Sequence, residues 1–234
     1  MTNLDKNLKY VAKITILLRL NCMIERKLLI LQSKEKKMKL IIMTKSTFFV
    51  EEDKILSTLF EKGMDNLHLY KPGTEPVYSE RLLTLLPEDY YSKITVHDHF
   101  YLKEEYRLRG IHLNDCQTEP PLRYKGNISR TCHHMDELKE AKKSSNYVFL
   151  NISFDSQGNI AMTEELKEAS RRGLIDKKVY AQGDITLDNI HTIKAFGFGG
   201  VVICDDLWNR FNIHNEQDYK ELIGHFEKLR KATS

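Results

Sequence analysis

The chain has 234 residues, of which 41% are hydrophobic and 29% are charged. This composition excludes a disordered or fibrous protein, and it allows one sizeable core, in one large α/β domain or two small ones. The four cysteines, Cys22, Cys116, Cys132 and Cys204, show no C-x-x-C spacing. Neither a zinc site nor a disulfide framework is therefore indicated, and we expect a reducing, cytoplasmic environment.

The formal net charge of +3 is unevenly distributed along the chain. Residues 1–37 hold nine Lys or Arg against three acids, a net of +6, which leaves a net of −3 for residues 38–234. An acidic body of this kind indicates no nucleic-acid partner. Lysine and arginine also interrupt the apolar runs of the basic segment well short of the ~20 apolar residues that a membrane span needs, so no membrane partner is expected.

The stretch Met38 to Thr44, MKLIIMT, reads as a short basic N-terminus that leads directly into a strand. We therefore expect Met38 to be the initiator, and residues 1–37 to be upstream sequence or an appendage. A genuine amphipathic anchor is the alternative. The domain proper is expected to cover residues 38–234.

From Met38 onward, apolar β-branched runs alternate with segments of helical period. Eight runs predict strands, at 39–45, 66–71, 93–99, 110–114, 128–134, 147–153, 178–184 and 200–206. Helices are predicted at 50–62, 79–89, 102–108, 135–143, 163–172, 187–196 and 218–231, with Thr163 as an N-cap and Gly63, Gly173 and Gly197 at helix ends. The stretch 115–126, which contains two adjacent prolines, predicts a loop where a helix would follow the fourth strand.

Eight strands joined by helices favour a single α/β domain, a (β/α)8 TIM barrel with an irregular connection after strand 4. From Met38 the chain has 197 residues (234 less 37), so the helices must be brief and the loops tight. An open doubly wound sheet is the alternative. It would require a G-x-G-x-x-G motif after the first strand, and TKSTFFVEED contains no glycine.

Function in such a barrel lies at the carboxyl ends of the strands. Lys71, after the second strand, is a candidate phosphate contact or a surface lysine. His133, after the fifth, is a candidate acid, base or hydrogen-bond donor, or a structural histidine.

Two further groups of residues indicate metal chemistry. His97 and His99 share one strand face and are either imidazole ligands of a metal or ordinary histidines. Asp98 and Asp115 are hard oxygen ligands, and Mg²⁺ is usually held by one or two carboxylates together with substrate phosphates.

The seventh strand runs into the glycine turn VYAQGDI, followed by helix-like sequence. Such a turn usually holds a phosphate, but here Gly183 is followed by the acid Asp184. The last loop repeats this conflict with Asp205 and Asp206.

The ordered series LHLYKP, TVHDHFYL, GIHLN, TCHHMDEL, YVFLNISFDS, AQGDI and GFGGVVICDDLW resembles the thiamine-phosphate synthase and thiazole tautomerase superfamily. The resemblance is greatest with its compact branch, and it covers residues 38–234. It implies a (β/α)8 barrel that joins hydroxymethylpyrimidine pyrophosphate to thiazole phosphate, with Mg²⁺, and releases pyrophosphate. The implied partners are small molecules; the sequence does not fix the oligomeric state, and a homo-oligomer stays open.

The resemblance also implies roles for single residues. Lys71 and His133 are the expected catalytic residues, and Asp98 is the expected Mg²⁺ ligand. The expected substrate-binding residues are His68, Tyr70, Lys71, His97, Thr131, Ser153, Gly183 and Gly200.

Several positions depart from the family pattern. Tyr70 replaces an arginine, Asp184 and Asp205 replace glycines, and the segment 155–159 lacks an expected cation. Two like charges about 4 Å apart repel by roughly 4 kcal/mol at an effective dielectric of 20, so the expected phosphate site is either impaired or reassigned. The alternatives to a synthase are a non-catalytic or reassigned small-ligand-binding barrel and a tautomerase-like enzyme, which Ile152 disfavours because it replaces the tautomerase histidine.

Overall fold

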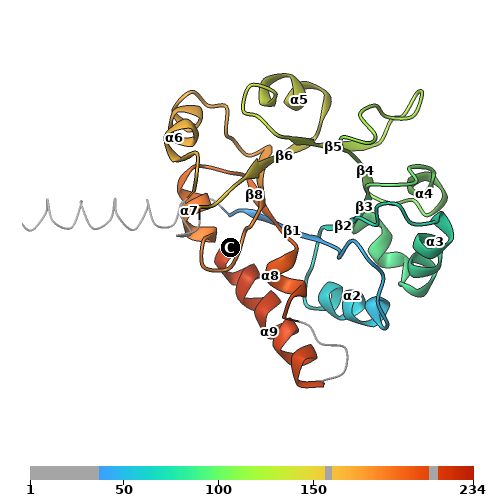
Figure 1. The fold of residues 1–234 in the computed structure, drawn as a ribbon. Coiled ribbons are helices and arrows are strands. Elements are labelled where there is room, and N and C mark those ends of the chain that lie inside the picture. Colours follow the sequence, from blue (N-terminus) through green and yellow to red (C-terminus); the bar gives the residue numbers. More distant parts are fainter. Residues whose placement is uncertain (1–36, 156–159, 211–215) are drawn as a thin grey trace, which may run out of the picture. The chain divides into compact units, whose positions relative to one another are not determined.

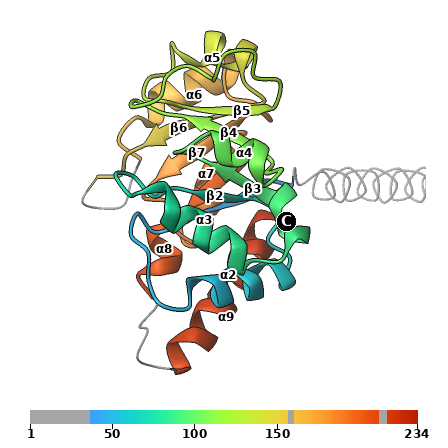
Figure 2. The ribbon, with the colours of Figure 1, turned by 90° about the vertical axis from the view of Figure 1, so that its right-hand side faces the viewer.

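Eight parallel strands form a closed barrel in the order β1 to β8 (Figures 1 and 2). The computed structural model describes residues 37–155, 160–210 and 216–234, and Met38–Thr233 form one unit. The strands are β1 (Lys39–Met43), β2 (Leu67–Leu69), β3 (Ile94–Val96), β4 (Gly110–Leu113), β5 (Asn127–Cys132), β6 (Tyr147–Ile152), β7 (Val179–Gly183) and β8 (Gly200–Ile203). Because β8 pairs with β1, the predicted barrel is confirmed and the open sheet is wrong. The expectations for residues 1–36 lie outside the described residues.

The strands are shorter than predicted, mostly at their carboxyl ends. Stretches 66–71 and 93–99 were expected to be strands, yet β2 and β3 have three residues each. After β3 the backbone N–H of His97 still donates to the Leu69 carbonyl oxygen at 3.1 Å, but His99 has a φ of 52°, a left-handed conformation outside the β region. The residues after each strand therefore form loops at the rim of the barrel.

Helices surround the barrel (Figure 1). They are α2 (Glu52–Glu61), α3 (Pro76–Leu85), the 3₁₀ helix η1 (Glu88–Lys93), α4 (Tyr101–Glu105), α5 (Leu138–Ser144), α6 (Thr163–Arg171), α7 (Ile190–Ala195), α8 (Asp205–Trp208) and α9 (Glu216–Thr233). Gly63, Gly173 and Gly197 follow α2, α6 and α7 with positive φ, as predicted for helix ends. Thr163 is the first residue of α6 rather than its cap.

The helix α8 was not predicted, because the strand expected at 200–206 extended past the apolar residues, through Cys204, into the residues that begin α8. Trp208 closes this short helix. Its side chain is fully buried, and its indole Nε1 donates a hydrogen bond of 2.6 Å to the carbonyl oxygen of Met43. This contact fixes α8 against the end of β1.

The connection from β4 to β5 contains no helix, as the two prolines predicted. Asn114 pairs with Gln117 in an isolated antiparallel bridge, and the Asn114 side-chain oxygen accepts hydrogen bonds from the backbone N–H groups of Cys116 and Gln117, each at 3.0 Å. This is an Asx-type turn. The outer surface of β5 is consequently less covered than that of its neighbours.

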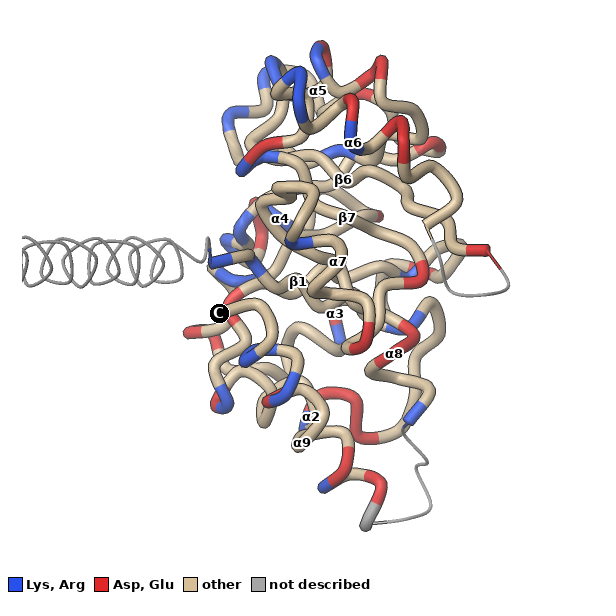
Figure 3. The backbone as a smooth tube through the Cα atoms, turned by 90° about the vertical axis from the view of Figure 1, so that its left-hand side faces the viewer, with Lys and Arg blue, Asp and Glu red and all other residues tan. Residues whose placement is uncertain are grey.

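Lys and Arg positions are interspersed with Asp and Glu along the backbone (Figure 3), and acidic positions lie beside α8. Among the described residues, no helix combines the length and apolar character that crossing a membrane requires.

Gly200 lies at the wrong end of β8 for the substrate-binding role expected of it. It is the first residue of the strand and pairs with Lys39, the first residue of β1. Both lie at the amino end of the barrel, opposite the rim where ligands bind. A Cβ on Gly200 would lie 2.5 Å from the Lys39 carbonyl oxygen and 2.9 Å from Cδ2 of Tyr180, so the glycine permits strand packing.

We expect Gly200→Ala to lower the free energy of unfolding by about 1–3 kcal/mol, the usual cost of overpacking. Chemical denaturation measures it. The matched control is Gly224→Ala in α9, where an added Cβ would meet nothing within 4 Å; replacing a helical glycine there should raise stability by up to about 1 kcal/mol. If the two variants shift the midpoint equally, the packing explanation is wrong.

Candidate functional site

The carboxyl ends of all eight strands meet at one rim because every strand is parallel to its neighbours. Three side chains from neighbouring strands form a hydrogen-bonded chain on this rim. His133 Nε2 lies 2.9 Å from Oδ1 of Asp115, and the Asn151 side-chain amide lies 2.9 Å from His133 Nδ1. With the amide nitrogen donating to Nδ1, the ring proton is on Nε2 and points to the carboxylate.

The Asp115, His133 and Asn151 chain is accessible to a ligand. The side chains of His133 and Asp115 are 42% and 76% exposed, and both line a pocket of about 770 Å³ that continues over the outer face of β5. An imidazole held between a carboxylate and an amide can donate or accept a proton at a fixed position. Sequence reasoning had singled out His133, but assigned no role to Asn151.

Two carboxylates lie near Tyr70 on the same rim. Burial raises the pKa of the Tyr70 phenol, and the negative charges of Asp98 and Asp115 raise it further. Asp98 accepts a hydrogen bond of 3.4 Å from the backbone N–H of Lys71. Asp98 follows β3 and Asp115 follows β4, and these two strands are paired neighbours, so both carboxylates belong to the same side of the rim. Carboxylate oxygen is the donor that Mg²⁺ prefers.

Lys71 does not present its ammonium group to the rim, contrary to the expected phosphate contact. The side chain is 1% exposed, and Nζ lies 2.7 and 2.9 Å from the two carboxylate oxygens of Glu52. It also donates to the Thr47 carbonyl oxygen at 2.9 Å and lies 4.4 Å from the ring centre of Phe48. Lys71 therefore anchors the loop between β1 and α2.

Burial opposes the ionisation of both Lys71 and Glu52, and their mutual attraction opposes this effect. Burial lowers the pKa of Lys71 and raises that of Glu52, while the charge of each partner acts in the opposite direction. The pair keeps both groups ionised only while both are present.

Lys45 is a cation near the rim to which the sequence assigned no role. It follows β1 and is half-buried. Burial is the main cause that raises the pKa of Cys204 to about 12, and the positive charge of Lys45 opposes this rise. Cys204, after β8, lies with its Sγ 3.6 Å from the carbonyl oxygen of Thr44, so Lys45, the next residue, lies near the start of the last loop.

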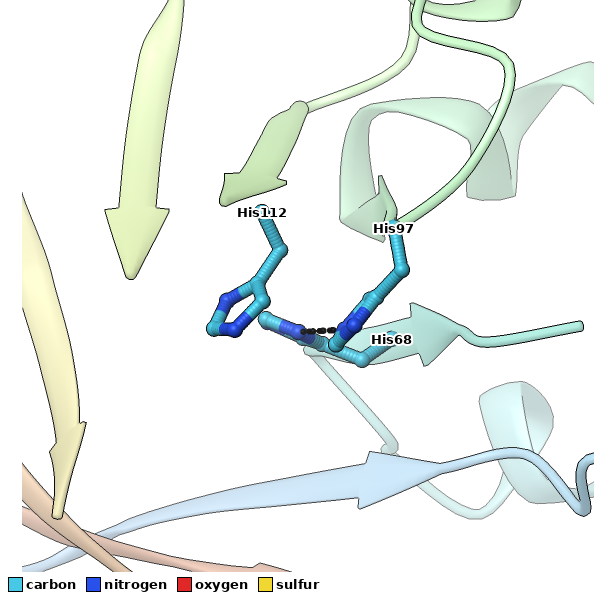
Figure 4. A group of neighbouring side chains, drawn as sticks. All are labelled: His68, His97 and His112. Carbon is cyan, nitrogen blue, oxygen red and sulfur yellow. Dashed lines mark hydrogen bonds between the residues drawn. The ribbon is translucent and has the colours of Figure 1, made fainter. Parts of the chain in front are cut away.

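His68 and His97 lie inside the barrel and not at its surface (Figure 4). They are 0% and 3% exposed, and His112 from β4 joins them at 0%. His68 Nδ1 and His97 Nε2 are 2.8 Å apart, and the rings of His97 and His112 stack with centroids 4.1 Å apart. Direct substrate contact by His68, as expected from the resemblance, does not fit this position.

The expected pairing of His97 with His99 is not formed. His99 leaves the strand with positive φ, and its Nε2 donates to the Thr74 carbonyl oxygen at 3.0 Å. Thr131, another expected substrate contact, has its hydroxyl 2.8 Å from Nε2 of His112. Its side chain is thus directed to the barrel interior.

Burial keeps the three interior histidines neutral. It lowers the pKa of His97 to about 3, and it lowers the pKa values of His68 and His112 well below their ordinary value, assisted by the other rings and by Arg109 and Arg130.

The glycine turn after β7 has the geometry that the sequence indicated. Gly183 has a φ of 124°, and a Cβ there would lie 2.2 Å from the Ile152 carbonyl oxygen, so only glycine fits. Asp184, which follows it, is exposed, as are Asp205 and Ser153. Exposed carboxylates are screened by water, which reduces the repulsion estimated from sequence. Asn159 lies outside the described residues.

Asp206 has a different role from these exposed acids. Its side chain is 7% exposed and lies 2.7 Å from Nε2 of His225. It also accepts a hydrogen bond of 3.1 Å from the backbone N–H of Leu187. Asp206 therefore connects α8 to α9 and to the loop after β7, and its carboxylate is already occupied.

A closed (β/α)8 barrel with a glycine turn, two carboxylates and a positioned imidazole on its rim defines a class of proteins that bind small ligands at strand ends. The crystal structure of thiamine phosphate pyrophosphorylase from Bacteroides thetaiotaomicron is 51% identical, with a TM-score of 0.77 over 83% of this chain and 97% of that chain. This chain belongs to the thiamine phosphate pyrophosphorylase family, also called thiamine-phosphate synthases.

Other solved structures share the fold alone. Thiamine phosphate pyrophosphorylase from Pyrococcus furiosus is 19% identical with a TM-score of 0.64, over 85% of this chain and 96% of that chain. The native KDPGal structure is 14% identical with a TM-score of 0.59, over 84% of this chain and 94% of that chain. No protein-family model and no curated protein matches the chain.

We expect Glu52→Gln alone to cost about 3–5 kcal/mol of unfolding free energy, because it leaves the Lys71 ammonium buried and unpaired. The double variant Glu52→Gln with Lys71→Met should cost less than the sum of the two single variants. A double-mutant cycle by urea denaturation measures this coupling.

The matched control for that cycle is the surface pair Glu51 and Lys54, whose side chains are 57% and 68% exposed. Its coupling energy should be about 0–1 kcal/mol. Equal coupling in the buried and exposed pairs would show that Lys71 is not the anchor described above.

Stability should fall on acidification, because the interior histidines cannot take up protons when folded. The ordinary pKa of histidine is 6.5, and burial lowers the pKa of His97 in the folded chain to about 3. Between these two pH values the unfolded chain binds a proton that the folded chain excludes. Each such group lowers the unfolding free energy by about 1.4 kcal/mol per pH unit inside that window. This contribution to stability is fully present above the pKa of histidine in the unfolded chain, and it is lost as the pH falls below that pKa.

Urea midpoints between about pH 7 and pH 5 test this dependence. His97→Gln should make the curve shallower, whereas the exposed His191→Gln should leave its slope unchanged. Identical slopes for wild type and His97→Gln would contradict the neutral, buried state.

Proposed function

We propose that this chain couples hydroxymethylpyrimidine pyrophosphate to thiazole phosphate and releases pyrophosphate, in the biosynthesis of thiamine. The observation that carries the proposal is the 51% identity to a thiamine phosphate pyrophosphorylase across 97% of that chain. The rim supports it, because it combines an oriented imidazole, two carboxylates and a glycine turn.

The reaction breaks the bond between the pyrimidine methylene carbon and the pyrophosphate oxygen, and the thiazole then bonds to that carbon. Nothing is oxidised or reduced. Negative charge develops on the departing pyrophosphate, so the protein must orient two anions and stabilise one of them.

Asp98 and Asp115 would hold Mg²⁺. The fit rests on their positions after the paired strands β3 and β4 and on the hydrogen bond that Asp98 accepts from the backbone of Lys71. When bound, Mg²⁺ supplies positive charge to pyrophosphate oxygens.

His133 is the proposed catalytic residue: its Nε2–H, which donates to Asp115 in the free protein, would donate to a substrate oxygen once Asp115 binds Mg²⁺. Asp115 and Asn151 hold the ring in one orientation. Lys45 replaces Lys71 as the proposed cation for a substrate phosphate, because Lys71 is engaged with Glu52. The turn at Gly183 is proposed to approach the thiazole phosphate with its backbone.

A second candidate is a barrel of the same family whose phosphate site is weakened or takes another small ligand. It is favoured by Tyr70 at the position of the family arginine and by the exposed acids Asp184 and Asp205. A tautomerase-like reaction has less support, since Ile152 is aliphatic and 3% exposed and provides no base.

The described cysteines Cys116, Cys132 and Cys204 are free thiols, which supports a reducing, cytoplasmic location.

The test is an assay of the purified chain with both substrates and Mg²⁺, measuring thiamine phosphate by thiochrome fluorescence and pyrophosphate release in parallel. His133→Gln should lower kcat by about 10²-fold or more, as expected for loss of an acid, base or donor. Asp98→Asn should raise the Mg²⁺ concentration required. His134→Gln, the exposed neighbour, is the matched control and should retain activity.

Calorimetry with thiazole phosphate and with its unphosphorylated alcohol separates the two candidates. Tighter binding of the phosphate, together with turnover, supports the synthase. Preference for the alcohol without turnover would overturn it in favour of the reassigned barrel, and Asp184→Gly with Asp205→Gly and Tyr70→Arg should then restore phosphate binding.

A further inference from the structure

Three imidazoles from adjacent strands converge inside the barrel, and nothing in the proposed reaction uses them (Figure 4). One ring nitrogen from each of His68, His97 and His112 lies within 4.8 Å of the other two. We propose that these histidines bind one divalent transition-metal ion of the Zn²⁺ class. This site is separate from the Mg²⁺ site proposed on the rim.

The distance between the His68 and His97 nitrogens is close to that of a metal site. Tetrahedral Zn²⁺ with Zn–N bonds of 2.0–2.1 Å holds its nitrogen ligands about 3.4 Å apart. His68 Nδ1 and His97 Nε2 are now 2.8 Å apart, so they separate slightly when an ion enters between them. The stacked rings of His97 and His112, inclined by 22°, rotate about their Cβ–Cγ bonds until their lone pairs point to a common centre.

Hydroxyl groups behind the rings supply the partners that metal-binding histidines normally have. His68 Nε2 lies 2.7 Å from the Tyr147 hydroxyl, and His112 Nδ1 lies 2.8 Å from the Ser129 hydroxyl. With His68 bonding through Nδ1 and His112 through Nε2, each remaining N–H donates to one of these oxygens. The Thr131 hydroxyl, which lies 2.8 Å from His112 Nε2 without a metal, turns away from that nitrogen when the ion binds. Such partners fix the tautomer and orientation of a ligating ring.

An imidazole binds a metal in its neutral form, through the lone pair of one ring nitrogen. Each ring keeps one N–H on the nitrogen that does not bind, so the three ligands release no proton. The positive charges of Arg109 and Arg130 oppose a proton and a metal alike, but the metal gains three dative bonds where a proton gains one.

The chemistry of the ligands selects the class of ion. Imidazole nitrogen suits Zn²⁺, Co²⁺, Ni²⁺ and Cu²⁺, whereas Mg²⁺ prefers oxygen. Thr95, two residues before His97 and on the same strand face, has a buried hydroxyl without a hydrogen-bond partner in the described structure. A buried polar atom of this kind indicates an additional occupant of the barrel interior, such as an ion with its water.

The experiment titrates Co²⁺ into the full-length protein after removal of metals with a chelator. Visible absorption reports tetrahedral nitrogen coordination, and competition with Zn²⁺ gives the zinc affinity. We expect one equivalent of Co²⁺ per chain, and an increase in melting temperature with Zn²⁺ but not with Mg²⁺.

His112→Gln should abolish this binding in protein whose circular dichroism shows that it is folded. Tyr147→Phe keeps all three ligands and removes only the hydroxyl behind His68, so it tests the site if His112→Gln does not fold. It should weaken binding by about tenfold. The control variants His133→Gln, on the rim, and His191→Gln, on the surface, should bind as the wild type does.

Three results would overturn the proposal. The first is that the wild type binds no Co²⁺ with tetrahedral geometry. The second is that Tyr147→Phe and folded His112→Gln bind Co²⁺ as the wild type does. The third is that His133→Gln removes the binding, which would place the ion on the rim.

Discussion

Closure of the barrel between β8 and β1 is the constraint on which the rest of the structure depends. It requires the two strands to approach at Gly200, where a side chain would meet the Lys39 carbonyl oxygen at 2.5 Å. Once closed, the parallel ring brings residues far apart in sequence to one rim. Asp115, His133 and Asn151 are 18 residues from one another in turn, and only the register of β4, β5 and β6 places them in contact.

Closure also creates an interior that side chains must fill. This chain fills part of it with aromatic residues, such as Phe149 and Tyr180, and part with the three histidines. Packing against Phe149 removes these rings from water, and hydroxyls of Tyr147, Ser129 and Thr131 satisfy their nitrogens. The three histidines are therefore compatible with burial, and they make the stability of the barrel sensitive to acid.

The sequence was sufficient to predict the eight strands, the closed barrel and the loop after strand 4, because periodicity and proline are local signals. It could not reveal the partner of Lys71, since Glu52 lies 19 residues away and on a different element. Gly200 received its substrate-binding role from the family resemblance alone, although it precedes the last strand in the sequence and therefore lies at the amino end of the barrel. The histidine cluster was missed for a related reason: the motif His97-x-His99 suggested ligands on one strand, whereas the contacts run across three.

The phosphate site combines features that favour and oppose anion binding. The backbone at Gly183 has the geometry of a tight turn, while Asp184 and Asp205 bring exposed charge to the neighbouring loops. Asp206, by contrast, is buried and accepts hydrogen bonds from His225 and from the backbone N–H of Leu187. The acidic character that sequence assigned to the whole rim thus belongs to side chains that water can screen.

The anchoring of Lys71 has a consequence for the loop between β1 and α2. Its ammonium group contacts the Thr47 carbonyl oxygen, the ring of Phe48 and the carboxylate of Glu52, so two points of this loop and the first residue of α2 are held before any ligand arrives. The conformational entropy of the loop is lost during folding rather than during binding. A ligand that enters beside Lys45 therefore meets a preorganised wall, and its affinity is not reduced by the ordering of that segment.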